Sequence, residues 1–464
     1  MLGIKRLSGR SALLALAFLF FWQAAALAAQ LTAVRFGSGV ERERIVFEMS
    51  ALPAYTAQTS ADGKQIVIEF TGLSDGARIK PATRGEVIRR VSYEKAGKNL
   101  RVVIDLAEPV AYEIKTLHKP ERIYINFQKN YEIRTDEVKA PGLVLTKYVR
   151  RDGRGLLTAY LLDVDPLRYD LVPALGNGQV RGRATVSNIS DDLGAMAAIN
   201  ANYFDTTGEI LGVLRLDGEL AGTTYFTRSA LGLRPGGAAF VAPVYYNATV
   251  RIGKVSRGVS GVNIARGEDA LVLYNHLFAA TTGTNEFGRE FIVRGGKVTA
   301  IRPANSPIPA DGYVISLHGA SKDAFARVKV GDTVTLTEDF GPQWINVPNI
   351  IGAGPTLVKG GRVAVNAKEE QFPADIAVGR APRTGVAVLS NRHLLLAVAD
   401  GRQASSIGCT LEEFAELLLK FGAKEAVNFD GGGSSEMVVG GVIVNSPSDG
   451  DERLVGSALA VLQK

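Results

Sequence analysis

Two aspartates in the C-terminal third of the sequence each end an apolar run and precede a glycine. Asp430 lies in "AVNFDGGGSSEMVVGG" and Asp400 in "HLLLAVADGR". A pair of carboxylates at one site suits general acid/base or nucleophilic catalysis at a glycosidic bond. Each Asp-Gly also fits an ordinary surface turn. Three glycines after Asp430 favour a site, because they open the backbone to a ligand and can turn bare N–H groups toward an anion. This predicted anion cradle consists of Gly431, Gly432, Gly433 and Ser434.

Polar side chains in two other stretches are candidates for substrate binding. Asn200 and Asn202 in "INANYF" follow an apolar run, and amides suit sugar hydroxyls or a developing oxyanion. Arg383 and Thr384 in "APRTGVAV" precede a strand, and the arginine fork matches phosphate. Each also fits a turn or a surface charge. Three further carboxylates are held in reserve: Asp205, Glu436 and Asp449.

The two aspartates flank a well-marked helix. Thr410 and Glu413 form a capping box, an apolar stripe runs along one face to Phe421, and Gly422 supplies the stop. A strand, a helix and a strand in succession predict a βαβ unit, whose parallel strands would bring both carboxylates to one edge of a sheet. Neighbouring strands would place the carboxylates roughly 5 Å apart, as in retaining glycosidases, whereas an intervening strand would favour inversion.

Residues 31–128 contain an internal repeat with an offset of 57 residues, which pairs Arg44 with Arg101, Tyr55 with Tyr112 and Phe70 with Phe127. Each half alternates apolar and polar residues with the period of half-buried strands. Two such halves predict an all-β sandwich. The segment resembles the AMIN domain of exported bacterial envelope proteins, which implies that it binds a cell-wall polymer. A structural β-domain without a ligand is the alternative.

The remaining segments complete the predicted organisation. Residues 1–28 carry basic residues, an apolar run and small residues, the pattern of a cleaved secretory signal, with an uncleaved anchor as the alternative. Residues 129–141 are polar and predict a linker. Residues 142–464 predict one mixed α+β domain that contains the βαβ unit.

Composition excludes several classes of protein. With 46% hydrophobic and 22% charged residues, the chain is predicted to fold over most of its length. The net charge of +6 suits an anionic partner, but no basic cluster interleaved with aromatic residues predicts a nucleic-acid site. The single cysteine forms no internal disulfide, and the four histidines show no zinc-site spacing, so no metal or cofactor is expected.

Six motifs in this order resemble the phosphodiester glycosidase family: "INANYF", "GAGPTLVKGG", "RTGVAV", "VADGR", "AVNFDGGGSSEMVVGG" and "NSPSDG". The resemblance implies hydrolysis of the glycosidic bond of a sugar-1-phosphate phosphodiester in a glycan or glycolipid. Sugar and a phosphate monoester would be released. The positions that match family motifs are Asn200, Arg383, Thr384, Asp400, Asp430, Gly431, Gly432, Gly433 and Ser434.

The predicted protein is therefore an exported hydrolase, periplasmic or associated with the cell wall, with Asp430 and Asp400 flanking the anomeric carbon. Two alternatives have different requirements. A non-catalytic wall-binding protein has little reason to keep both aspartates with Arg383 and Ser434, all of which are present. A metal-dependent phosphodiesterase needs a cluster of carboxylates and histidines, which the sequence does not suggest.

Overall fold

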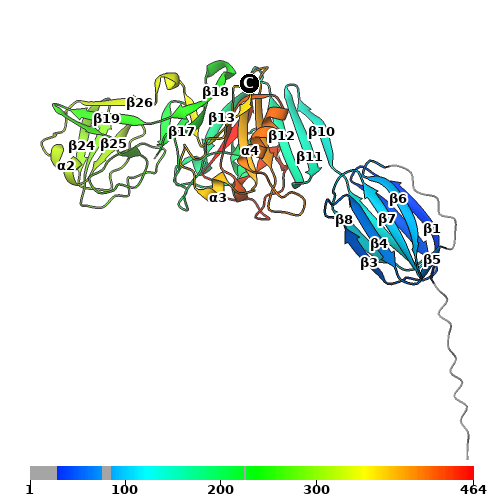
Figure 1. Cartoon of the computed structure of the whole chain (residues 1–464). Helices are drawn as coiled ribbons and strands as arrows, with labels where there is room; N and C mark the ends of the chain where they lie inside the picture. The colour runs from blue at the N-terminus through cyan, green and yellow to red at the C-terminus, as the bar shows by residue number, and fades with distance from the viewer. Residues whose placement is uncertain (1–28, 76–84, 224–225) are drawn as a thin grey trace, which may run out of the picture. The chain divides into compact units, whose positions relative to one another are not determined.

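The computed structural model describes residues 29–75, 85–223 and 226–464. The chain divides into two units, Met1–Lys129 and Asn130–Lys464 (Figure 1). The predicted secretory signal, residues 1–28, lies outside the described residues. Within the described ranges, no helix is long and apolar enough to cross a membrane.

The first unit is the β-sandwich that the repeat predicts. Its sheets have the orders β5-β1-β2-β9-β8 and β3-β4-β7-β6. Along β2 and β7, buried positions alternate with less buried ones, and the buried side chains of both sheets form one core. The strands are β1 (Ala29–Ser38), β2 (Arg42–Met49), β3 (Tyr55–Thr59), β4 (Gln65–Phe70), β5 (Leu73–Asp75), β6 (Ile88–Ala96), β7 (Asn99–Leu106), β8 (Tyr112–Leu117) and β9 (Arg122–Gln128).

The repeat is visible in the strand positions, because β7, β8 and β9 begin 57 residues after β2, β3 and β4. Each sheet contains strands from both halves, so neither half forms a sheet alone. Ring contacts also repeat: the centroids of Tyr55 and Phe70 lie 6.1 Å apart, and those of Tyr112 and Phe127 lie 6.2 Å apart. The two halves therefore share both sheets and a single core.

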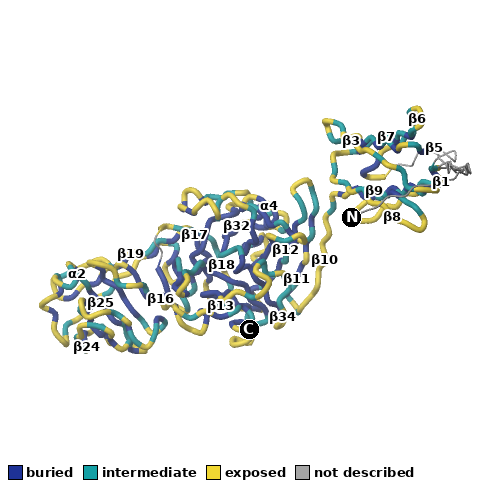
Figure 2. The backbone as a smooth tube through the Cα atoms, turned by 90° about the horizontal axis from the view of Figure 1, so that it is seen from below, coloured by how far each residue is buried: buried dark blue, intermediate teal, exposed yellow. Residues whose placement is uncertain are grey.

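The second unit is built on two packed antiparallel sheets with a helix on each outer face. The eight-stranded sheet has the order β10-β11-β12-β31-β30-β32-β28-β29, and the five-stranded sheet β13-β35-β14-β33-β34. One core lies between the sheets, α4 packs on the outer face of the larger sheet, and α1 on the outer face of the smaller one. In Figure 2 this unit is dark blue along its inner strands, where residues are buried.

The elements of these layers have the following bounds. The larger sheet contains β10 (Tyr131–Ala140), β11 (Leu143–Asp152), β12 (Gly155–Val164), β28 (Thr356–Lys359), β29 (Arg362–Val363), β30 (Arg383–Leu389), β31 (Leu394–Ala399) and β32 (Ala423–Asn428). The smaller sheet contains β13 (Tyr169–Leu175), β14 (Ala197–Asn200), β33 (Met437–Val439), β34 (Val442–Ile443) and β35 (Ser457–Gln463). The helices are α1 (Val186–Asp192), α3 (Ala374–Ala377) and α4 (Leu411–Lys420).

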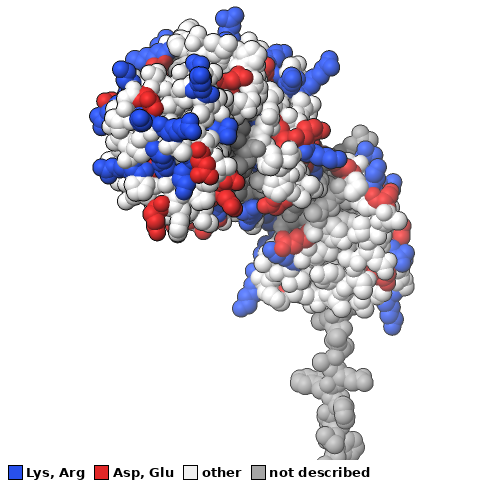
Figure 3. All heavy atoms as spheres, turned by 90° about the vertical axis from the view of Figure 1, so that its left-hand side faces the viewer, with Lys and Arg blue, Asp and Glu red and all other residues white. Residues whose placement is uncertain are grey.

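Residues 214–352 add further sheets to this unit, packed around a second core in which Trp344 is 1% exposed. On the face of the larger unit that Figure 3 presents, basic and acidic side chains are interspersed rather than gathered by sign. Its elements are β15 (Leu214–Leu216), β16 (Glu219–Gly222), β17 (Arg228–Leu233), β18 (Ala239–Val244), β19 (Asn247–Ile252), β20 (Val255–Gly258), β21 (Gly261–Val262), β22 (Leu271–Tyr274), β23 (Arg289–Arg294), β24 (Lys297–Arg302), β25 (Gly312–Leu317), α2 (Gly319–Ala324), β26 (Val334–Asp339) and β27 (Asn349–Gly352).

The helix between the two aspartates forms as predicted, with both hydrogen bonds of the Thr410–Glu413 capping box. The two flanking strands are not neighbours, however. β30 lies between β31 and β32 and is antiparallel to both, so β31 and β32 point in the same direction without pairing. A mostly antiparallel β-sheet unit therefore takes the place of the predicted parallel βαβ pair, and its two aspartates still lie at one edge of the sheet.

The predicted linker, residues 129–141, is also different in the structure. Residues 131–140 form β10, which pairs antiparallel with β11 along the edge of the larger sheet. Most of this strand is exposed, so its sequence is charged rather than alternating. Charged side chains are usual on edge strands because they discourage pairing with another chain. Polar composition alone thus led to the wrong prediction here.

Candidate active site

Asp430 lies at the end of β32 and is only partly exposed. Its backbone is held on both sides, since its N–H donates to the Ala201 carbonyl at 2.9 Å and its carbonyl accepts from Asn200 Nδ2 at 2.6 Å. Burial raises the pKa of Asp430 to about 6, although hydrogen bonds from Ser434 and Gly431 and the charge of Arg453 favour its ionised form. A carboxyl that titrates near neutral pH suits acid/base chemistry.

Each glycine after Asp430 has its own structural reason. A Cβ at Gly431 would meet the Pro382 carbonyl at 2.9 Å, and Gly432 has a φ of 63°. A Cβ at Gly433 would clash with the paired side chains of Arg453 and Asp449. The loop therefore lacks side chains partly because they would clash with neighbouring residues of the protein. It leaves less room for a ligand than the open anion cradle predicted from the sequence.

Two arginines lie over this loop, and neither was predicted from the sequence to belong to the site. Arg453 donates to Asp449 Oδ2 through Nε at 2.9 Å and Nη2 at 2.5 Å, and through Nη1 to Ser434 Oγ at 3.5 Å. Arg402 is exposed, and its Nη1 lies 3.3 Å from the position of a Cβ built on Gly432. Within the described part of the chain, the Arg402 guanidinium makes neither a hydrogen bond nor an ion pair, so its charge is available to a ligand.

Asp400 lies at the same end of the sheet, but its carboxylate is already used in hydrogen bonds within the protein. It is 3% exposed, and its Oδ1 accepts from Asn445 Nδ2 at 3.1 Å and from the Ser446 N–H at 3.0 Å. Burial raises the pKa of this carboxyl, and the two hydrogen bonds partly offset the effect. Asp400 therefore anchors the start of the loop 445–453, whose far end carries Arg453.

The predicted sugar-binding amides are buried and bonded inside the protein. Asn200 is 1% exposed, and its Oδ1 accepts from Thr384 Oγ1 at 2.8 Å and from the Glu436 N–H at 3.2 Å. Asn202 is also 1% exposed and donates through Nδ2 to the carbonyls of Gly352 and Val213 at 2.8 and 3.3 Å. This geometry gives the two asparagines and Thr384 a positioning role, with Asn200 tying Asp430 to β30.

Arg383 is likewise turned into the protein. Its guanidinium is 3% exposed and donates to the carbonyls of Cys409, Ile376 and Gly379 at 3.2, 3.1 and 2.6 Å. Burial lowers the pKa of Arg383. The predicted contact with phosphate is not supported by these bonds, which instead join the loops around α3 and α4.

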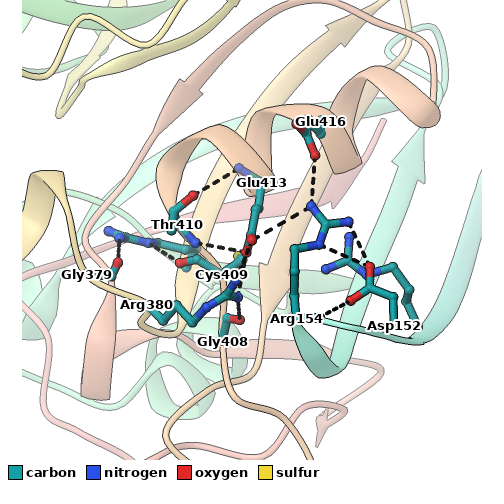
Figure 4. A network of polar contacts seen from close by, with 11 residues as sticks. Asp152, Arg154, Gly379, Arg380, Gly408, Cys409, Thr410, Glu413 and Glu416 are labelled. Carbon is teal, nitrogen blue, oxygen red and sulfur yellow. Dashed lines mark hydrogen bonds and ion pairs between the residues drawn. The ribbon is translucent and has the colours of Figure 1, made fainter. Parts of the chain in front are cut away.

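A second network reinforces the same rim (Figure 4). Arg380 forms two hydrogen bonds with the Glu413 carboxylate at 2.5 and 2.6 Å, at the N-terminus of α4. Arg154 on the β11–β12 turn reaches Glu416 at 3.2 Å and also contacts Asp152 (Figure 4). The network fixes the helix that precedes β32, so the sheet edge with both aspartates is rigidly supported.

The reserve carboxylates have separate positions. Asp449 pairs with Arg453 on the glycine loop, whereas Asp205 accepts from the Thr207 N–H at 2.8 Å within its own turn. Glu436 is buried directly after the glycine loop. In the described residues, no group of three or more His, Cys, Asp or Glu side chains is placed to hold a metal ion.

Comparison with known proteins supports both sequence resemblances. Residues 33–131 match the AMIN domain family, and residues 287–462 match the phosphodiester glycosidase family. In a curated protein, the SPbeta prophage-derived uncharacterized protein YomE of Bacillus subtilis (strain 168), 88 residues are 38% identical. That match covers 19% of this chain and only 14% of the prophage protein.

Two solved structures share the fold at low sequence identity, and a third is similar at a lower TM-score. A hypothetical protein from Synechocystis has a TM-score of 0.65 and 23% identity, over 94% of this chain and 81% of that one. A protein of Burkholderia pseudomallei K96243 described as exported has a TM-score of 0.58 and 22% identity, over 88% and 96%. The zebrafish N-acetylglucosamine-1-phosphodiester alpha-N-acetylglucosaminidase catalytic domain, auto-inhibited by its pro-peptide, has a TM-score of 0.41 and 17% identity, over 77% and 90%.

These matches confirm the two resemblances that the motifs indicated: residues 33–131 are similar to the AMIN domain family, and residues 287–462, which include Asp400, Asp430 and the glycine loop, are similar to the phosphodiester glycosidase family.

Proposed function

We propose that the protein is an exported hydrolase that cleaves the glycosidic bond of a sugar-1-phosphate phosphodiester. Water adds to the anomeric carbon, the bond between that carbon and the bridging oxygen breaks, and a phosphate monoester leaves with the electron pair. The observation that carries the proposal is Asp430, a carboxyl with a pKa raised to about 6 beside a bare glycine loop and two arginines.

The phosphodiester is assigned to the surface formed by Arg402, Arg453 and the glycine loop. Arg402 supplies a guanidinium that has no carboxylate partner among the described residues, and guanidinium matches phosphate through two parallel hydrogen bonds. Arg453 is already oriented by Asp449 and Ser434. Positive charge at this position stabilises the leaving phosphate as its charge develops, which lowers the need for a general acid.

Asp430 is assigned as the base that takes a proton from the attacking water. β31 and β32 are separated by β30, so their ends lie two strand spacings apart, roughly 9.6 Å. Retaining glycosidases need their carboxylates at about 5 to 5.5 Å, whereas inverting ones leave room for a water. The separation is too long for Asp400 to partner Asp430 in a retaining mechanism, so we propose direct attack of water with inversion and assign Asp400 as a positioning residue that holds the loop 445–453.

The AMIN domain gives the proposal a location. AMIN domains occur in secreted and periplasmic proteins, so we assign the first unit to binding a cell-wall polymer and the protein to the envelope. Deleting residues 29–129 should leave hydrolysis of a soluble substrate intact and abolish retention on wall preparations. Loss of both activities together would contradict this division of labour.

A substrate panel tests the proposed reaction. The protein is incubated with aryl and alkyl phosphodiesters of several sugar-1-phosphates, and the released phosphate monoester is measured. Turnover of at least one member is expected, with kcat lowered by several orders of magnitude in Asp430→Asn. Undiminished turnover in that variant would reject Asp430 as the base.

A further inference from the structure

A pair of buried carboxyl groups lies beneath the candidate site and has no role in the reaction described above. Glu436 is 2% exposed, and Glu452, on the loop that carries Arg453, is partly buried. Glu436 Oε1 and Glu452 Oε2 are both buried without a hydrogen-bond partner. The two side chains lie within hydrogen-bonding reach of each other, although two ionised carboxylates offer no proton to share.

The pair joins the two loops that form the site. The Glu436 N–H donates to Asn200 Oδ1 at 3.2 Å, and Asn200 also holds the Asp430 carbonyl. Glu452 Oε1 accepts from Ser187 Oγ on α1 at 2.9 Å, and the next residue is Arg453. A bond between the two carboxyls therefore fixes the arginine loop to the loop that bears Asp430.

Among the described residues, no basic side chain links the two carboxyl groups, so only a proton on one of them can join the pair. No Lys, Arg or His among them lies within ion-pair distance of Glu436 or Glu452. On the neighbouring elements, Asp191 and Asp192 of α1 are exposed, and Asp449 pairs with Arg453. Burial first, and then the charge of Glu452 and the hydrogen bond with it, raise the pKa of Glu436 to about 8.

We propose that Glu436 and Glu452 share one proton, and that this bridge is a positioning pair that holds Arg453 over the glycine loop for phosphodiester binding. The part concerning the phosphodiester rests on the proposed function, whereas the shared proton does not. Loss of the proton leaves two negative charges in contact, and their repulsion moves the loop 445–453 away from Ser434. Affinity for a phosphodiester therefore falls in alkaline solution.

The direction of the pH effect follows from the raised pKa. The bridge is present at neutral pH and is lost as the pH rises through about 8. In the wild-type protein, KM should rise by up to about tenfold per pH unit above this point, with a smaller change in kcat. The free energy of unfolding should decline between pH 4.5, the ordinary pKa of a glutamate, and about 8, and should level off above that point because both states are then ionised.

Glu436→Gln tests the bridge, because its amide donates to an ionised Glu452 at every pH. The variant should keep near-normal KM at neutral pH and lose the alkaline rise, and Glu452→Gln should do the same. Glu286→Gln, at an exposed position, is the matched control and should follow the wild type. Thermal unfolding as a function of pH gives a readout without substrate, and it applies to the wild type even when a variant folds poorly.

A decline in stability between pH 4.5 and about 8 that is the same in the wild type and both Gln variants would overturn the shared proton. A stability decline removed by Glu436→Gln, together with an unchanged alkaline rise in KM, would overturn the positioning role alone. If no sugar-1-phosphodiester is turned over at any pH, the proposed function fails. The unfolding measurements still decide the carboxyl pair.

Discussion

Replacing Asp430 with asparagine should make the second unit more stable at neutral pH while abolishing catalysis. The pKa of Asp430 is raised from an ordinary 3.8 to about 6, which means that the folded protein holds this carboxylate at a free-energy cost. At about 1.4 kcal/mol per pH unit, the cost amounts to about 3 kcal/mol once the group is fully ionised. Asparagine has no charge to desolvate, and its carbonyl oxygen still accepts from Gly431 or Ser434.

The sign of this effect depends on pH. Because the folded pKa lies above the unfolded one, the favourable contribution is complete below pH 3.8 and is lost as the pH rises through about 6. Asp430→Asn should therefore raise the free energy of unfolding at pH 7.5 by up to about 3 kcal/mol and leave it nearly unchanged at pH 4. The gain is reduced by the lost attraction between the carboxylate and Arg453.

Urea unfolding at the two pH values measures the difference, with Trp344 fluorescence as a probe inside the second unit. Asp205→Asn is the control of opposite sign: burial opposes ionisation of Asp205, but hydrogen bonds from Thr207 and Glu209 prevail and lower its pKa. That variant should lose stability at pH 7.5. Equal stability of Asp430→Asn and wild type at both pH values would refute the assignment of Asp430 as a desolvated carboxylate.

Four other outcomes are expected. The kcat/KM of the wild type should rise as the pH increases through about 6, because the base must be ionised, and a profile flat from pH 5 to 7 would exclude Asp430 from that role. Arg402→Gln should raise KM for a phosphodiester by tenfold or more, through loss of about 1.5 to 3 kcal/mol of charged hydrogen bonding, with kcat changed less. Asp400→Asn keeps an acceptor for Ser446 and should lower kcat by less than tenfold; a loss as large as that of Asp430→Asn would make Asp400 catalytic. Gly433→Ala should displace Arg453, raise KM and lower the midpoint of thermal unfolding, and unchanged values would show that the loop has room.

Local patterns were sufficient to predict much of the fold. The offset of 57 residues predicted the sandwich, because each repeated strand keeps its own alternation of buried and exposed positions. The capping box and apolar stripe predicted α4 for the same reason, since the signals lie within one helix. Pairing between strands is not a local property: nothing in the residues between Asp400 and Asp430 reveals that β30, which precedes both strands, lies between them.

The site was predicted in part. Asp430 and its glycine loop carry their signal in one short stretch, and the structure places a partly buried carboxyl there. Asn200 and Arg383 were predicted to bind the ligand because the sequence shows the chemistry of each side chain. It does not show the backbone carbonyls to which these side chains already donate hydrogen bonds in the fold. Arg453 was missed because its position depends on a loop that returns from the end of β34.

The most direct test of the proposed reaction is hydrolysis of a sugar-1-phosphate phosphodiester in water labelled with oxygen-18. Attack at the anomeric carbon, with Asp430 as the base, predicts that the heavy oxygen appears in the released sugar and that the phosphate monoester carries none. Label in the phosphate would mean cleavage of a phosphorus–oxygen bond and would contradict the assignment of the protein as a glycosidase.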